Sequence, residues 1–234
     1  MKKIILSAAA LFVFGFANAQ DLKFGAKAGV NFANLTMDYS GEGDFSEDNA
    51  MKIGFHVGGL VEIKFSEKFA LQPELLFSTQ GTKTESSEND GDGFVSSYEA
   101  TTNLAYVNIP IMVKFYPIPS LYIEAGPQVG FLVSAKEKAE GSATYTTFDG
   151  EGNPITVTES FETDEDVKDF YKSIDFGINV GVGYEFTENL GANVRYNLGL
   201  SDISETPDEF DDFGFGDLFK TRNQVIQLSL AYKF

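Results

Sequence analysis

Residues 174–186 read IDFGINVGVGYEF, and this stretch decides the fold. Bulky apolar side chains occupy every even position from Ile174 to Phe186. The odd positions hold two acids, one asparagine and three glycines. A period of two is that of a β-strand, in which successive side chains point to opposite faces. The stretch therefore predicts a long strand with one apolar and one polar face.

The same alternation recurs through the rest of the chain. Eight segments carry it, at about 22–34, 51–65, 69–82, 98–115, 121–134, 172–186, 190–201 and 220–234. Such strands exceed the roughly five or six residues usual in soluble sheets. They suit tilted membrane-crossing strands of about 9–11 residues. Because an open sheet of such strands would aggregate through its edges, we predict that it closes into a barrel.

Short and long connections alternate between these segments. The short ones lie at 66–68, 116–120 and 187–189. The long ones lie at about 35–50, 83–97, 135–171 and 202–219. Outer-membrane barrels have short periplasmic turns and long extracellular loops. We therefore predict an all-β fold, an eight-stranded antiparallel up-and-down transmembrane β-barrel with four long extracellular loops.

Residues 1–19, MKKIILSAAALFVFGFANA, have the organisation of a secretory signal peptide. Lys2 and Lys3 precede an apolar run, and Ala17-Asn18-Ala19 supplies a cleavage site of small residues. The run is shorter than the roughly 20 residues of a membrane-anchoring helix. We expect cleavage after residue 19, with residues 20–234 forming one barrel domain in the outer membrane.

The composition excludes several classes of function. The chain has 35 acidic and 17 basic residues and a net charge of −18, so we expect no nucleic-acid partner. It has no cysteine, which excludes disulfides and thiolate metal sites. The single histidine, His56, lies in mid-strand on a polar face, so we interpret it as an interior hydrogen-bonding residue rather than a general base. We expect no enzyme activity and no cofactor.

Alternation alone does not say which face lies inside. A soluble lipocalin-like barrel has an apolar interior, whereas a membrane barrel has a polar one. Here the polar faces are rich in Gly, Asn and Gln, and their opposite charges balance, as a buried network requires. The charges that we expect inside are Lys27, Lys52, Lys64, Lys114, Arg195, Glu62, Glu74, Glu124, Asp175 and Glu185.

Aromatic residues near the strand ends favour the membrane alternative. They match the interfacial girdles of outer-membrane barrels. The predicted girdle residues are Phe65, Phe69, Phe115, Tyr116, Tyr122, Tyr184, Phe186, Tyr232 and Phe234. An eight-stranded barrel is just wide enough to be filled by side chains, so we expect a polar, plugged interior.

Four stretches resemble the PorT-like family of small outer-membrane β-barrel proteins. They are KFGAKAGVNFANL (23–35), YVNIPIMVKFYP (106–117), LYIEAGPQVGFLV (121–133) and QLSLAYKF (227–234). The resemblance implies an outer-membrane barrel without shared catalytic residues, and some relatives serve secretion systems. Leu228, Leu230, Tyr232 and Phe234 resemble the C-terminal signal read by the outer-membrane assembly machinery. That machinery and outer-membrane lipid are the partners expected from the resemblance.

The predicted loops hold most of the negative charge. Residues 36–50, 83–96, 136–170 and 201–219 contain 26 of the 35 acidic residues and four lysines. The acidic runs 164–166 and 208–212 could bind Ca²⁺ or Mg²⁺, but they lack the spacing of a calcium loop, and we interpret them as solvated. The aromatic residues of 210–219 suggest an interaction surface or a plug over the barrel mouth.

Three hypotheses of function follow. The first is a non-enzymatic structural or surface-interaction protein whose acidic loops reach a cationic or protein partner outside the cell. The second is a small transport or secretion-associated barrel. The third is a soluble periplasmic barrel that binds an apolar ligand.

Overall fold

The computed structural model describes residues 21–39, 49–90, 94–205 and 219–234. These residues form nine strands and a 3-10 helix, η2 (Lys168–Phe170). The strands are β1 (Asp21–Tyr39), β2 (Asn49–Lys64), β3 (Phe69–Asn89), β4 (Val95–Ile118), β5 (Leu121–Phe148), β6 (Pro154–Asp166), β7 (Ile174–Glu185), β8 (Leu190–Gly199) and β9 (Phe219–Lys233). The expected signal peptide and nearly all of the aromatic run 210–219 lie outside the described residues.

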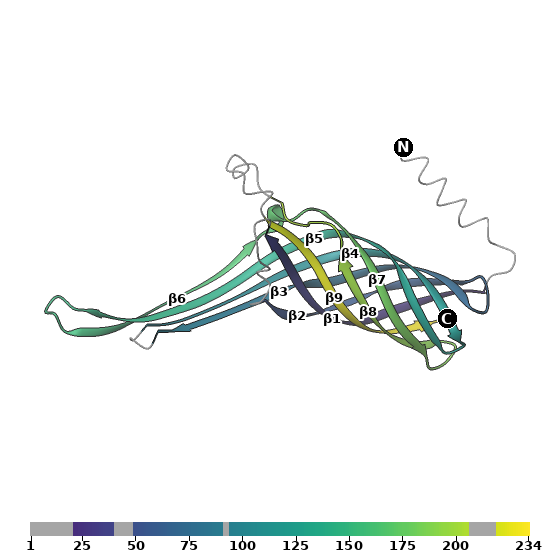
Figure 1. Ribbon diagram of the computed structural model, residues 1–234, viewed down its shortest axis with the longest axis horizontal. Coiled ribbons are helices and arrows are strands. Elements are labelled where there is room, and N and C mark those ends of the chain that lie inside the picture. Colours follow the sequence, from purple (N-terminus) through teal and green to yellow (C-terminus); the bar gives the residue numbers. More distant parts are fainter. Residues whose placement is uncertain (1–20, 40–48, 91–93, 206–218) are drawn as a thin grey trace.

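Eight of the strands close an antiparallel barrel (Figure 1). Neighbours follow chain order from β1 to β5 and continue through β7, β8 and β9. The ring closes where β9 pairs with β1, from Gly25 opposite Lys233 to Tyr39 opposite Phe219. The predicted eight-stranded up-and-down barrel is confirmed. The ninth strand, β6, pairs only with β5 among the described strands.

The three short connections lie at one end of the barrel (Figure 1). They join β2 to β3, β4 to β5 and β7 to β8. The C-terminal end of β9 lies at the same end. This agrees with the arrangement predicted from the connection lengths.

The prediction of long loops is wrong for two of the four segments. The segment 83–97 is mostly paired strand, because β3 runs to Asn89 and β4 begins at Val95. The segment 135–171 contains the end of β5 and all of β6. Outside the lipid a strand needs no apolar face, so the amphipathic pattern used to find the spans is missing there.

These extensions form a four-stranded sheet that projects beyond the barrel (Figure 1). We call it the β arm, and it consists of residues 83–89, 95–101, 136–148 and 154–166. The arm continues β3, β4 and β5 away from the short turns. It therefore extends from the end of the barrel predicted to face the outside of the cell.

Side chains alternate between an apolar exterior and a polar interior. On β7 the outward Phe176 and Val180 are 53% and 50% exposed, whereas Asp175 and Asn179 are 4% and 0% exposed. The same holds on β8, where Arg195 is fully buried. A polar interior under an apolar wall is the arrangement of a membrane barrel and contradicts the lipocalin-like alternative. Among the described residues, no helix has the length and apolarity to cross a membrane.

The predicted aromatic girdle holds except at two positions. Phe65, Tyr184 and Phe234 are among the outward aromatic side chains, and they lie at or next to the ends of β2, β7 and β9 on the short-turn side. Tyr116 and Tyr122 instead lie inside, each 3% exposed, and their rings contact each other at a centroid distance of 5.5 Å. Both have the inward parity of their strands, which decides orientation more strongly than closeness to a strand end.

Candidate functional site

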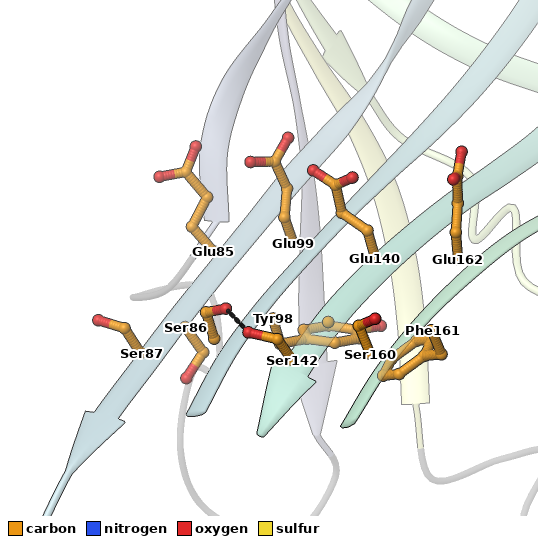
Figure 2. Close-up of a pocket in the computed structure, with 12 residues that line it drawn as sticks. Glu85, Ser86, Ser87, Tyr98, Glu99, Glu140, Ser142, Ser160, Phe161 and Glu162 are labelled. Carbon is orange, nitrogen blue, oxygen red and sulfur yellow. Dashed lines mark hydrogen bonds between the residues drawn. The ribbon is translucent and has the colours of Figure 1, made fainter. Parts of the chain in front are cut away.

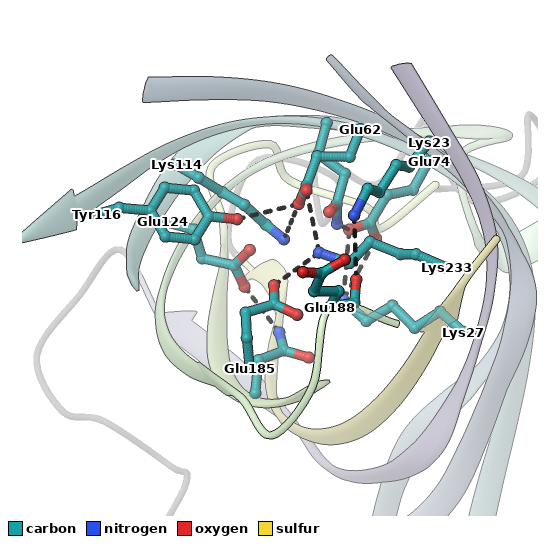
Figure 3. Close-up of polar contacts among 12 residues, drawn as sticks. Lys23, Lys27, Glu62, Glu74, Lys114, Tyr116, Glu124, Glu185, Glu188 and Lys233 are labelled. Carbon is teal, nitrogen blue, oxygen red and sulfur yellow. Dashed lines mark hydrogen bonds and ion pairs between the residues drawn. The ribbon is translucent and has the colours of Figure 1, made fainter. Parts of the chain in front are cut away.

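The first candidate site is a buried ion-pair network in the barrel interior (Figure 3). At its centre Arg195 of β8 reaches across to β3. Its Nη1 and Nη2 donate to the two carboxylate oxygens of Glu74, at 3.0 and 2.9 Å. Its Nε donates to Glu124 at 3.0 Å, and Lys27 Nζ lies 3.3 Å from Glu74. The fork of Arg195 thus links two carboxylates that belong to different walls of the barrel.

Figure 3 also shows a second group of ion pairs. It lies nearer the short turns, because Glu62, Glu185 and Lys233 are at or near the ends of β2, β7 and β9. Glu62 accepts hydrogen bonds from Lys114 at 3.0 Å, from Lys233 at 2.9 Å and from the Tyr116 hydroxyl at 3.0 Å. Lys233 also donates to Glu185 at 2.7 Å. The barrel is therefore crossed by hydrogen-bonded charges at this level.

Of the ten charges expected inside, seven are buried. They are Lys27, Lys114, Arg195, Glu62, Glu74, Glu124 and Asp175. Glu185 is partly buried and joins the network through Lys233. Lys52 and Lys64 are only half-buried and lie outside these ion pairs; the Nζ of Lys64 is 4.8 Å from the centroid of the Tyr116 ring.

Sequence reasoning missed one member of the network, Lys233. It is 3% exposed and bonds both Glu62 and Glu185. The signal was present, because Lys233 shares the inward parity of Gln227 and Ser229. With Lys233 included, the ion pairs join four cations to four carboxylates, and Asp175 is left outside them.

His56 lies in a layer of amides and hydroxyls next to the network. One ring nitrogen is 2.7 Å from Asn31 Oδ1 and the other is 2.9 Å from Ser229 Oγ. The side chain is 1% exposed. With both nitrogens engaged and no access to solvent, the ring fits the interior hydrogen-bonding role expected from the sequence.

An apolar cluster closes the interior at the end where the β arm begins. It consists of Leu35, Leu104, Tyr106, Leu132, Ala135 and Ile203. Ile203 follows β8 and is fully buried. Its N–H donates to Thr221 O and its carbonyl accepts from Lys172 N, both at 2.8 Å. A segment outside the strands thus inserts a side chain into the barrel mouth.

Asp202 holds this segment in place. Its carboxylate pairs with Lys172 at 2.9 Å and accepts hydrogen bonds from Ser204 and from the Thr221 N–H. Partial burial raises the pKa of Asp202, but these hydrogen bonds outweigh it, and the net pKa is below its usual value. We call residues 200–205 the Ile203 strap.

The second candidate site is the acidic face of the β arm (Figure 2). Four glutamates lie directly opposite one another on adjacent strands: Glu85, Glu99, Glu140 and Glu162. The parallel row two residues further out consists of Ser87, Ser97, Ser142 and Ser160. Figure 2 shows the four carboxylates pointing the same way. These rows border a shallow depression of about 780 Å³, which Tyr98 and Phe161 also line.

Like charges directly opposite one another destabilise a sheet, so the glutamate row has an energetic cost. Lys83 offsets part of it, with its Nζ 2.7 Å from Glu85 and 2.8 Å from Glu99. Hydrogen bonds to Glu85 and Glu99 raise the pKa of Lys83 above its usual value. Among the described residues, no lysine forms an ion pair with Glu140 or Glu162, and these two glutamates extend the negative potential to the β6 edge.

The donor sets do not form a carboxylate-rich metal centre in the part of the chain that the structure describes. There, no three His, Asp or Glu side chains are grouped as metal ligands. Asp164, in the acidic run 164–166, pairs instead with Lys138 at 3.2 Å. The run 208–212 lies outside the described residues.

The proposed C-terminal signal forms an outward row on β9. Leu228, Leu230, Tyr232 and Phe234 are 40% to 73% exposed. The N–H of Phe234 donates to Phe24 O at 2.8 Å, so the last residue still pairs with β1.

No curated protein matches the sequence. Among solved structures, Neisserial surface protein A is 14% identical, with 93% of this chain and 100% of that chain covered and a TM-score of 0.42. OprG from Pseudomonas aeruginosa is 11% identical, covering 93% and 98%, with a TM-score of 0.38. Ail of Yersinia pestis is 10% identical, covering 92% and 99%, with a TM-score of 0.37.

The family model described as "Outer membrane protein beta-barrel domain" matches residues 17–205. That range includes every strand except β9. The outward apolar wall and the closed ring agree with this match, and the chain belongs to the outer membrane protein beta-barrel domain family, whose members reside in the outer membrane.

Proposed function

We propose that this protein is a non-enzymatic outer-membrane anchor that displays the β arm to cationic partners outside the cell. The observation that carries the proposal is the continuity of the arm with the barrel wall. Strands β3, β4 and β5 run without interruption from the membrane span into the arm. The arm is thus positioned by the barrel rather than by a flexible linker.

The filled interior supports an anchor rather than a channel. The Arg195 network spans the barrel. In the described structure, the apolar cluster around Ile203 lies between this network and the β arm. Ions crossing this interior would have to break buried ion pairs and then pass the apolar cluster, and both steps cost free energy. Steady conductance is therefore not expected.

The negative charge of the β arm indicates which class of partner it would bind. The arm presents the glutamate row, and β6 adds further acids at Glu159, Asp164, Glu165 and Asp166. Such a one-signed surface attracts cations and repels anionic polymers, with a strength that falls as salt screens it. A lysine- or arginine-rich protein segment fits this surface better than a nucleic acid.

The proposal includes two further expectations from the sequence. Export depends on residues 1–19 as a cleaved signal peptide. Within the family, the chain belongs with the PorT-like members, on the four stretches quoted above. Labelling the mature N-terminus tests the first, since its sequence should begin at Gln20.

Binding of a lysine-rich peptide tests the display role. The protein is placed in lipid nanodiscs, and affinity is measured at several salt concentrations. The variant Glu140→Gln/Glu162→Gln should weaken binding several-fold and flatten its salt dependence. The matched control Glu67→Gln/Glu188→Gln removes equal charge from the short turns and should bind like the wild type. Equal affinity in all three proteins would refute the role of the arm.

Planar-bilayer recording tests the anchor role. We expect no steady conductance from the wild-type protein. A stable open level that disappears in a variant of the interior network would support the transport alternative instead.

A further inference from the structure

We propose that the barrel interior holds a sodium-binding site built around Asp175, near the end from which the β arm projects. The site consists of the Asp175 carboxylate, the side-chain oxygens of Asn108 and Asn223, and the Ser201 hydroxyl; we call it the Asp175 cluster. It lies beside Tyr106, a member of the apolar cluster that closes the barrel mouth.

The first argument is the charge of Asp175. Its side chain is 4% exposed, yet it makes no ion pair with any described residue, whereas the other buried carboxylates all do. Within the described structure it accepts hydrogen bonds only from neutral groups, Ser201 Oγ at 2.8 Å and Asn223 Nδ2 at 2.9 Å. A buried charge without a counter-charge is expensive. A bound cation would remove that cost.

The second argument is a pair of unused acceptors. Asn108 Oδ1 and Asn223 Oδ1 are buried and have no hydrogen-bond partner among the described residues, and their residues are 2% and 0% exposed. Turning the Asn223 amide by 180° does not remove the problem of the unpaired oxygen. Its Nδ2 donates to Asp175, and exchanging the amide atoms would place an oxygen against the carboxylate. Buried polar atoms of this kind need a partner that the side chains do not supply.

The third argument is how Gly130 places these groups together. Gly130 pairs with Asn108 on one side and with Asp175 on the other. A Cβ at Gly130 would lie 2.6 Å from Asn108 Oδ1 and 3.7 Å from the Asp175 Cβ. The amide oxygen thus occupies the space above the glycine, on the side of the barrel wall where Asp175 stands.

The donor chemistry selects the ion. One carboxylate with amide and hydroxyl oxygens is a hard, all-oxygen donor set, which excludes the softer transition metals. Only one negative charge is present in the cluster. A monovalent ion neutralises it, whereas a divalent ion would leave an excess buried positive charge. Sodium therefore fits better than calcium or magnesium.

Sodium binding should be coupled to the position of the Ile203 strap at the barrel mouth. Ser201, which donates to Asp175, belongs to the Ile203 strap, and its Oγ also accepts a hydrogen bond from Phe176 N at 2.8 Å. Ile203 lies two residues further along the strap and fills the apolar cluster. An ion on Asp175 would thus favour the closed position of the strap.

Thermal unfolding of the full-length mature protein in detergent tests the site. The unfolding temperature is followed by heat-modifiable gel mobility in sodium chloride and in choline chloride of equal ionic strength. A ligand that binds only the folded state stabilises it in proportion to ln(1 + [L]/Kd). We expect a higher unfolding temperature in sodium, and we expect this difference to vanish in Asp175→Asn.

Two further variants keep the test sharp. Asn108→Leu retains the volume but removes one ligand oxygen, so it should shift the sodium dependence to several-fold higher concentration. The control Asp164→Asn removes an exposed acid of the β arm and should keep the wild-type dependence. Equal unfolding temperatures of the wild type in sodium and choline would overturn the proposal. A response to millimolar calcium that exceeds the response to sodium would overturn the assignment of the ion.

Discussion

Arg195 and Glu74 form a fully buried bidentate ion pair between β8 and β3, on different sides of the barrel. The two residues are 121 positions apart in the sequence. Such a pair brings little net stability, because its attraction mainly offsets the loss of hydration of both groups. Its structural consequence is specificity, since a shifted register on either strand would leave both charges buried without a partner.

Replacing one member of this pair should therefore be severe. In Arg195→Met, the buried Glu74 and Glu124 lose their shared guanidinium. We expect a loss of roughly 3–5 kcal/mol in the free energy of unfolding. Urea titration followed by heat-modifiable mobility measures it. The control Lys83→Met breaks the two exposed arm pairs with Glu85 and Glu99 and should leave the unfolding midpoint nearly unchanged. A similar midpoint for both variants would contradict the structural role of the network.

The membrane-spanning part of this fold was predictable because lipid imposes a simple pattern. Alternation located all eight spans, and its parity identified the inward faces that carry Glu74 and Arg195. The ion pair itself was not predictable, because it depends on ring closure and on the relative stagger of distant strands. Asp175 was found by parity, but its lack of a cation became visible only with the partners in place.

The β arm escaped prediction for the opposite reason. Residues 154–166, PITVTESFETDED, lack a continuous apolar face because β6 lies outside the lipid and the strand is almost entirely exposed. We expect its acids to protect the exposed edge of the strand, which composition alone does not suggest. The outer edge of β6 has no strand neighbour in the described structure, and exposed edges invite pairing between molecules.

Neutralising that edge should therefore cause self-association. In Glu159→Gln/Glu162→Gln/Asp164→Asn, repulsion between the β6 edges of two molecules is reduced, because three of the five acids of β6 are neutralised. We expect dimers or larger species above the detergent-solubilised monomer, growing with salt concentration. Sedimentation velocity measures them. If the triple variant stays as monomeric as the wild type at high protein concentration, charge does not protect this edge.

The Ile203 strap should open in acid. The pKa of Asp202 is lowered in the folded protein, so its stabilising effect is complete above the unfolded pKa, near 3.8, and is lost as the pH falls through the folded value. Protonation weakens the pair with Lys172 and the bond from Thr221 N. Pepsin cleavage within residues 200–205 should therefore increase as the pH falls below about 4. In Asp202→Asn, cleavage should be raised already at pH 4.5 and should depend less on pH, after correction for pepsin activity on an unfolded peptide.

Glycines on the two faces of the wall should differ in their tolerance of a methyl group. Gly183 faces inward, where a Cβ would lie 2.2 Å from the Tyr122 ring. Gly183→Ala should therefore displace Tyr122 and destabilise the barrel by about 1–3 kcal/mol. The Tyr122 ring also makes a cation–π contact with Lys114, whose Nζ is 4.1 Å from the ring centroid. Gly59 faces outward, and the nearest atom to its added Cβ is 3.8 Å away. Gly59→Ala should unfold at the same urea concentration as the wild type. Because both changes add one methyl group to a strand glycine, a difference between them measures interior packing. An equal loss in both variants would show that the sheet backbone, rather than Tyr122, limits substitution.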